Sequence, residues 1–240
     1  MEDWTQAERI MVALDYPNKQ QAERLLQQLE GIPCYMKVGM ELFYAEGPSF
    51  VAELKKQGYR VFLDLKMHDI PNTVKGGAAS ITRMGVDMFN VHAAGGSAMM
   101  EAAMEGVAQA SAGSNERPTV IAVTQLTSTS QHMLNGEIGI AGTVQDTVVR
   151  YAKLASQAGL QGVVASPVEV AAIKEACSAS FVTVTPGIRP AGAAIGDQSR
   201  VMTPKEARAA GTDYMVIGRP ITAAEHPRQA IEQIVKELSE

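Results

Sequence analysis

Eight short apolar segments, separated by segments with helical periodicity, recur along this chain of 240 residues. They are rich in Val, Ile, Met and Phe, and several are almost continuously apolar, which is typical of parallel strands covered on both faces. The pattern predicts strands over Ile10–Asp15, Tyr35–Gly39, Val61–Lys66, Met88–His92, Val120–Gln125, Gly162–Ser166, Phe181–Thr185 and Tyr214–Gly218.

The segments that follow these strands carry helix signals. Thr203 is a candidate N-cap, and Pro204 directly after it suits the first position of a helix. Glycines at 58, 85, 159 and 211 stand where a left-handed residue commonly ends a helix. We expect helices over Lys19–Glu30, Pro48–Gln57, Val74–Met84, Ala98–Ala110, Thr143–Ala158, Val168–Cys177, Pro204–Ala210 and Pro227–Leu238.

Eight consecutive strand–helix units in a chain of this length predict an α/β fold, the (β/α)8 TIM barrel. A doubly wound open sheet is the alternative. No linker rich in Pro or Ser divides the sequence, so we expect a single domain over residues 1–240.

Composition and motifs exclude several classes of function. The net charge of −5 argues against broad nucleic-acid binding, which needs a basic surface. No segment approaches the ~20 apolar residues of a membrane span, and the acidic N-terminus lacks a signal core, so we expect a cytoplasmic protein. Cys34 and Cys177 are expected to be packed thiols. The four histidines lack metal-ligand spacing, and the P-loop, GxGxxG and GxSxG patterns are missing, so we expect no metal and no nucleotide cofactor.

Polar residues stand at or just past nearly every predicted strand end. In a TIM barrel these ends meet at one mouth, where the catalytic groups lie. The rule collects scattered positions into one expected pocket, made by Asp15, Lys37, Asp64 with Lys66, His92, Thr127, Ser166, Arg189 and Arg219.

The stretch FLDLKMHDIPNTV, from Phe62 to Val74, places charges at the end of an apolar strand. Because side chains alternate along a strand, Asp64 and Lys66 are expected to share one face. Together with Lys37 and Asp69 they can form an array in which carboxylates hold each lysine protonated. An oriented ammonium at Lys66 can donate a proton to a developing carbanion. The alternative is a structural ion-pair network.

The loops after the last two predicted strands are expected to bind an anion. Loops after strands 7 and 8 of these barrels often bind phosphate with backbone amides and a short extra helix, which we expect over Ile221–Glu225. Gly218 permits close backbone approach, and Arg189 and Arg219 can add paired donors. Residues 190–199 have the length and composition of a lid, from which Gln198 can reach a bound phosphate. An ordinary flexible connection is the alternative.

Several motifs together resemble one family. DLKMHDIPNTV, NVHAAGG, VTQLTS, TPGIRP with GDQ, VIGRPIT and the early ALDYP occur in the order found in orotidine 5′-phosphate decarboxylases of the short bacterial type. The HDIPNT extension is the specific part of the resemblance. It implies conversion of orotidine 5′-phosphate to uridine 5′-phosphate and carbon dioxide, in pyrimidine biosynthesis, without a metal or other cofactor.

The resemblance also implies roles for single residues. Lys66 would deliver the proton to C6, and Asp64 would lie near the substrate carboxylate. Asp69 and Thr73 would cross into the neighbouring subunit's site, making a homodimer with shared active sites. The remaining expected contacts are Asp15 and Lys37 to the ribose, Thr127 and Ser166 to the pyrimidine, and Gln198, Arg219 and the Gly218 amide to the phosphate, with Arg189 nearby.

Three other functions stay open on the sequence. A sugar-phosphate decarboxylase or aldolase-like synthase on a related barrel carries a similar DxKxxD arrangement and typically needs magnesium. A Schiff-base aldolase would use Lys66 as nucleophile. A phosphate-ligand binding protein without catalysis is the third, although such a protein has little use for the charge array.

Overall fold

The structure is a computed structural model that describes residues 4–113, 116–190 and 201–240. Eight parallel strands close into a barrel in the order of the sequence, each hydrogen-bonded to the next and β8 to β1. The open-sheet alternative is therefore wrong. The strands are β1 (Ile10–Ala13), β2 (Tyr35–Gly39), β3 (Arg60–Met67), β4 (Met88–His92), β5 (Thr119–Val123), β6 (Gly162–Val164), β7 (Val182–Thr185) and β8 (Tyr214–Ile217).

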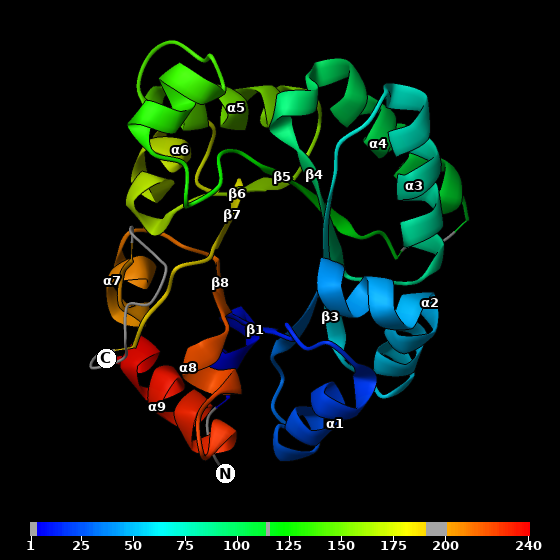
Figure 1. The fold of residues 1–240 in the computed structure, drawn as a ribbon, viewed down its shortest axis with the longest axis vertical. Helices are drawn as coiled ribbons and strands as arrows, with labels where there is room; N and C mark the ends of the chain where they lie inside the picture. Colours follow the sequence, from blue (N-terminus) through cyan, green and yellow to red (C-terminus); the bar gives the residue numbers. More distant parts are fainter. Residues whose placement is uncertain (1–3, 114–115, 191–200) are drawn as a thin grey trace.

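Helices form the outer ring around the barrel (Figure 1). The α-helices are α1 (Lys19–Gln28), α2 (Met40–Lys56), α3 (Pro71–Arg83), α4 (Ser97–Ala110), α5 (Val144–Gln157), α6 (Val170–Ala176), α7 (Pro204–Ala209), α8 (Arg219–Thr222) and α9 (Pro227–Ser239). Short 3-10 helices lie at η1 (Thr5–Arg9), η2 (Ala93–Gly95) and η4 (Pro167–Glu169), and a π-helix at η3 (Met133–Glu137). Among the described residues, no helix is both long and apolar enough to cross a membrane.

The helix after β2 and the short extra helix after β8 differ from the sequence prediction. α2 begins at Met40 rather than at Pro48, because the chain turns helical directly after β2 and then kinks at Gly47, whose φ is 70°. The kink accommodates Pro48, which cannot continue an unbroken helix. The short extra helix lies over Arg219–Thr222 and not over Ile221–Glu225, since it starts immediately after Gly218.

Local signals elsewhere are confirmed. The Thr203 side chain accepts a hydrogen bond from the backbone N–H of Glu206, and the Glu206 carboxylate accepts one from the N–H of Thr203, which makes a capping box at α7. The four glycines expected after helices, at 58, 85, 159 and 211, all have positive φ. Both cysteines are free thiols, and burial raises the pKa of Cys34 to about 12.

The core has two parts. The larger part lies between the strands and the helices, and the smaller fills the barrel interior with Met11, Tyr35, Phe62, Met88, Ile121 and Val184. Side chains two residues further along a strand point the same way. The next layer toward the carboxyl ends therefore holds Lys37, Asp64 and Asn90 above Tyr35, Phe62 and Met88. An apolar floor thus lies directly beneath a polar layer.

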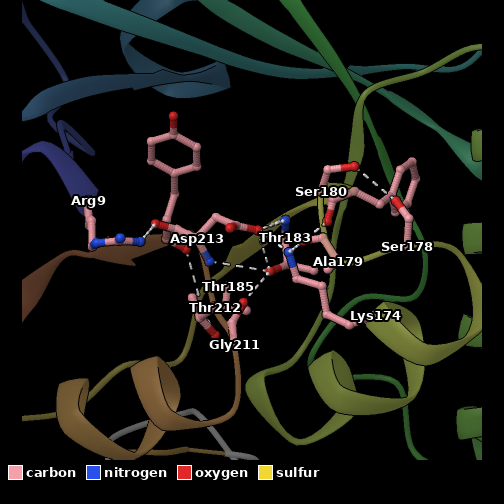
Figure 2. Close-up of polar contacts among 12 residues, drawn as sticks. Arg9, Lys174, Ser178, Ala179, Ser180, Thr183, Thr185, Gly211, Thr212 and Asp213 are labelled. Atoms are coloured by element: carbon pink, nitrogen blue, oxygen red, sulfur yellow. Dashed lines mark hydrogen bonds and ion pairs between the residues drawn. The ribbon is translucent and has the colours of Figure 1, made fainter.

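A network of polar contacts lies at the opposite end of the barrel, around β7 and β8 (Figure 2). The Asp213 carboxylate accepts hydrogen bonds from Lys174 Nζ at 2.6 Å and from the Thr183 backbone N–H at 2.7 Å. Lys174 Nζ also donates to the carbonyl of Phe181 at 2.9 Å. These contacts join α6, β7 and the turn before β8. They lie at the amino-terminal ends of the strands, where interactions serve stability.

Helix α3 packs very closely on helix α4. A Cβ atom placed on Gly106 would lie 2.2 Å from the carbonyl oxygen of Lys75 and 3.2 Å from the amide nitrogen of Ala79. Only glycine allows the two backbones to approach in this way. The contact fixes α3, whose first turn contains the last three residues of the HDIPNT segment.

Candidate active site

A cleft of about 750 Å³ opens at the carboxyl-terminal mouth of the barrel. The volume suits a small-molecule ligand. Its lining includes eight of the residues predicted from the sequence: Asp15, Lys37, Asp64, Lys66, Thr127, Arg189, Gly218 and Arg219.

A chain of ion pairs crosses the cleft directly above the apolar floor. Lys37 Nζ lies 2.9 Å from Asp15 Oδ1 and 3.5 Å from Asp64 Oδ2. Lys66 Nζ lies 2.8 Å from Asp64 Oδ1. The Lys37 side chain is 8% exposed and that of Asp64 13%, whereas that of Asp15 is 61% exposed. Asp64 is therefore the buried centre of the array, shared by two ammonium groups.

The electrostatics keep Asp64 ionised. Burial acts to raise the pKa of its carboxyl, but the charges of Lys37 and Lys66 and the hydrogen bonds from Lys66 and Asn90 outweigh burial, so the pKa is lowered. A permanent negative charge at this depth holds both lysines in fixed positions.

Gly39 leaves room for the array at the end of β2. A Cβ atom on Gly39 would lie 3.1 Å from Asp15 Oδ1 and 3.2 Å from Lys37 Nζ. Both distances are tighter than ordinary contact, so a side chain here would press on the ion pair. Gly39 was not singled out from the sequence, because the apolar run YMKVG predicts only a strand.

Strand β3 reaches the cleft through an irregularity. The β3–β4 register runs from Leu63 opposite Phe89 to Met67 opposite Val91. Lys66 has a φ of 55°, in the left-handed region that non-glycine residues seldom adopt. Asp64 and Lys66 still face the same side, as predicted, while Leu65 and Met67 pack on the outer core.

Asn90 holds this irregular segment and was missed in the sequence. Its Oδ1 accepts from the Lys66 backbone N–H at 2.8 Å, and its Nδ2 donates to Asp64 Oδ1 at 2.7 Å. The residue is only 1% exposed. One signal was available, since an asparagine inside the apolar strand MFNVH must find hydrogen-bond partners when it is buried.

Asp69 and Thr73 lie apart from the cleft. Both are exposed, and the Asp69 carboxylate accepts a hydrogen bond from the adjacent Ile70 N–H at 2.6 Å. The described part of the chain gives Asp69 no ion pair with Lys37 or Lys66. The array predicted from Lys37, Asp64, Lys66 and Asp69 is therefore not formed within one chain, because Asp15 and not Asp69 is its fourth member.

The two loops that the sequence predicts to bind phosphate lie at the other side of the barrel mouth. Gly187, Arg189, Gly218 and Arg219 line the cleft, where Gly218 directly precedes α8. Arg189 is held by its backbone, whose N–H donates to the carbonyl of Met202 at 3.0 Å. Gln198 and the other residues of the expected lid from 191 to 199 lie outside the described residues.

Ser166 is buried just beyond β6 and does not line the cleft surface. Within the described part of the chain its hydroxyl has no hydrogen-bond partner. Its backbone N–H donates to the carboxylate of Glu169 at 2.9 Å, and Glu169 is only 2% exposed. Sequence reasoning missed Glu169, although S-x-x-E before an apolar run is a capping signal. Thr127 is half-buried on the cleft wall.

His92 lies next to the array, and its ring faces that of His68 with centroids 5.6 Å apart and the two planes tilted by 41°. Burial, the charge of His68 and the charge of Lys66 lower the pKa of His92, so the ring is neutral at pH 7. Over the residues that the structure describes, no group of three or more His, Cys, Asp or Glu is arranged to hold a metal ion.

Comparison with known proteins assigns the chain to a family. The model of the orotidine 5′-phosphate decarboxylase / HUMPS family matches residues 8–234. The orotidine 5′-phosphate decarboxylase of Bacillus cereus strain AH820 is 53% identical over 95% of this chain and 96% of its own length. That of Bacillus cytotoxicus is 53% identical over 94% of both chains.

Solved structures agree with this assignment. The orotidine 5′-phosphate decarboxylase of Lactobacillus acidophilus matches with a TM-score of 0.86 and 42% identity, covering 96% of this chain and 99% of that one. An uncharacterized conserved protein from Geobacillus kaustophilus matches with a TM-score of 0.85 and 50% identity, covering 95% and 99%. The chain belongs to the orotidine 5′-phosphate decarboxylase / HUMPS family.

Proposed function

We propose that this protein converts orotidine 5′-phosphate to uridine 5′-phosphate and carbon dioxide, with Lys66 as the proton donor. The observation that carries the proposal is the Lys66 ammonium, fixed 2.8 Å from Asp64 Oδ1 in a cleft with an apolar floor. An ammonium held in this way is placed to stabilise and protonate a carbanion.

The cleft accounts for each part of the substrate. The phosphate would lie at Gly218 and Arg219, where backbone and guanidinium donors meet an anion. The ribose hydroxyls would meet Asp15 and Lys37. The pyrimidine would then lie between Lys66 and the Thr127 side of the cleft. The contact with Ser166 that the resemblance implies would require its buried hydroxyl to become accessible from the cleft.

The reaction transfers one electron pair and one proton. The bond between C6 and the carboxylate carbon breaks, carbon dioxide leaves, and the electron pair stays on C6. Lys66 Nζ then gives its proton to C6, and solvent restores the proton to the amine. Asp64 stays ionised beside the departing carboxylate, so its charge opposes that carboxylate and is no longer opposed once carbon dioxide has left.

We further propose a homodimer in which Asp69 and Thr73 complete the partner's site. Both are exposed at the start of α3, and the exposed Ile70 lies between them in the chain, with 67% of its surface accessible. In such a dimer the partner subunit would cover Ile70, an apolar side chain that a single chain leaves in solvent. The free cysteines fit a reducing compartment, and we place the enzyme in the cytoplasm.

The first experiment follows the loss of orotate ultraviolet absorbance when orotidine 5′-phosphate is mixed with the protein in excess chelator. We expect rapid loss with uridine 5′-phosphate as product. No loss in folded, dimeric protein would refute the proposal and favour the magnesium-dependent sugar-phosphate reactions.

Two variants test the assigned residues. Lys66→Ala should lose turnover far more than uridine 5′-phosphate binding, because it removes an interaction made in the transition state. Mixing inactive Lys66→Ala with inactive Asp69→Ala should restore partial activity, since one site of each mixed dimer is then intact. Verified mixed dimers without activity would refute the shared site.

A further inference from the structure

The segment of β3 that carries the charges contains more residues than the strand beside it. Between the pairs Leu63–Phe89 and Met67–Val91, β3 has three residues where β4 has only Asn90. Those three residues, 64 to 66, cannot all pair with one neighbour in a regular ladder. Such a bulge leaves backbone groups unpaired and bends the strand.

The Asn90 side chain supplies the contacts that the ladder lacks. Its Oδ1 takes the Lys66 N–H at 2.8 Å, in place of a backbone carbonyl. Its Nδ2 donates to Asp64 Oδ1 at 2.7 Å, the same oxygen that receives Lys66 Nζ at 2.8 Å. The Asn90 amide therefore holds both the backbone of Lys66 and the Asp64 carboxylate, to which the Lys66 ammonium binds.

The backbone at Lys66 needs such a support. A φ of 55° is unfavourable for a residue with a side chain and persists only when its surroundings fix it. Asn90 is 1% exposed and stands on the interior face of β4, directly above Met88 of the apolar floor. It is a rigid support on a strand rather than on a loop.

We propose that Asn90 is the positioning residue of this site: its amide holds the bulge that aims the Lys66 ammonium at the reacting carbon and fixes Asp64 beside it. The proposal rests on the proposed decarboxylation. Asn90 has no role in the chemistry itself; it acts through Lys66 and Asp64.

Two variants separate positioning from simple packing. Asn90→Leu removes both hydrogen bonds, and Asn90→Asp keeps the acceptor for the Lys66 N–H but replaces the donor with an oxygen facing Asp64. A displacement of about 1 Å at a reacting group can cost about 100-fold in rate, and we expect a fall in kcat of that order for both variants at pH 7. Affinity for uridine 5′-phosphate should change by no more than about threefold, ~0.6 kcal/mol.

The pH dependence of kcat distinguishes positioning from packing, because a loss of packing alone would not change it. When the carboxyl introduced by Asn90→Asp is protonated, its O–H can donate to Asp64 and its carbonyl can accept from Lys66, as the amide does. The ratio of its kcat to that of the wild type should therefore rise as the pH is lowered. Asn90→Leu should show no such rise.

The control is Thr124→Val, on the neighbouring loop after β5. Thr124 is 2% exposed, and its hydroxyl donates at 2.9 Å to the carbonyl of Val164, which is not a member of the array. The Thr124→Val substitution removes one buried hydrogen bond at a depth similar to that of Asn90, and kcat should stay near the wild-type value. Active sites are counted by titration with uridine 5′-phosphate, so that unfolded protein does not imitate a loss of kcat.

Crystal structures of the variants test the positioning without any activity measurement. We expect Lys66 to leave the left-handed region in Asn90→Leu. A wild-type kcat for Asn90→Leu, or an unmoved Lys66 together with a flat pH ratio for Asn90→Asp, would overturn the proposal. Lack of turnover in the wild type would instead refute the proposed function and leave the crystallographic test of Asn90 standing.

Discussion

Replacing Asp64 by asparagine tests whether the array is a buried electrostatic unit. The change keeps the shape of the side chain and removes its charge, which leaves Lys37 and Lys66 with two like charges across a neutral group. Breaking a buried ion pair by removing one partner costs about 3–5 kcal/mol. Two features reduce this figure: the side chain of Lys66 is 26% exposed, and Lys37 keeps Asp15 at 2.9 Å.

We therefore expect Asp64→Asn to lower the free energy of unfolding by about 2–3 kcal/mol at pH 7. For a domain of this size each kcal/mol shifts Tm by about 2–4 °C, so the expected fall is roughly 4–12 °C. Urea denaturation and calorimetry at pH 7 measure both quantities. Asp15→Asn is the matched control, because its carboxylate is 61% exposed and should contribute below about 1 kcal/mol.

The pH dependence of the free energy of unfolding tests the sign of the contribution from Asp64. The pKa of Asp64 is lowered in the folded protein, so its stabilisation is fully present above its unfolded pKa, ~3.9, and is lost as pH falls through the lower folded value. The difference between wild type and Asp64→Asn should shrink only in that acidic range. A variant within about 0.5 kcal/mol of the wild type at pH 7 would refute the view of Asp64 as the centre of the array.

Three further changes are predicted. Gly106→Ala should destabilise the fold by about 1–3 kcal/mol in urea titrations, because its Cβ meets the Lys75 carbonyl oxygen, whereas Gly76→Ala, with open space around it, should be neutral or stabilising. Arg219→Ala should mainly raise KM in steady-state assays, since it removes the guanidinium that we propose binds the substrate phosphate. His92→Asn should reduce the loss of stability on acidification below about pH 6.5, because the lowered pKa of His92 means that the unfolded chain takes up the proton first.

The barrel and its mouth were predictable because both follow from periodicity. Apolar runs mark the strands, and the rule for strand ends then brings Lys37, Asp64 and Arg219 to one cleft although they lie far apart in the sequence. The start of α2 was missed for a local reason. Pro48 is typical of a first helical turn, and nothing before it indicates that the helix already runs from Met40 and kinks at Gly47.

The backbone bulge and the hydrogen bonds that position Lys66 were not predictable from local sequence patterns. The run VFLDLKM alternates as an ordinary strand does, so the bulge shows only when β3 is paired with β4. Asn90 lies 24 residues beyond Lys66, and its role depends on that pairing. The role proposed for Asp69 in a neighbouring subunit's site likewise depends on a second chain, which no spacing within one sequence specifies.

The geometry of the array explains how a site of fixed charges can drive a reaction without changing shape. Asp15, Lys37, Asp64 and Lys66 together carry no net charge, but the charge is unevenly placed. In the proposed pose the substrate carboxylate starts beside Asp64, and the electron pair left on C6 faces Lys66. Negative charge therefore moves from a place where the array opposes it to a place where the array stabilises it. Because the apolar floor excludes water from beneath these groups, both effects are larger than they would be in solvent, and neither requires the protein to reorganise.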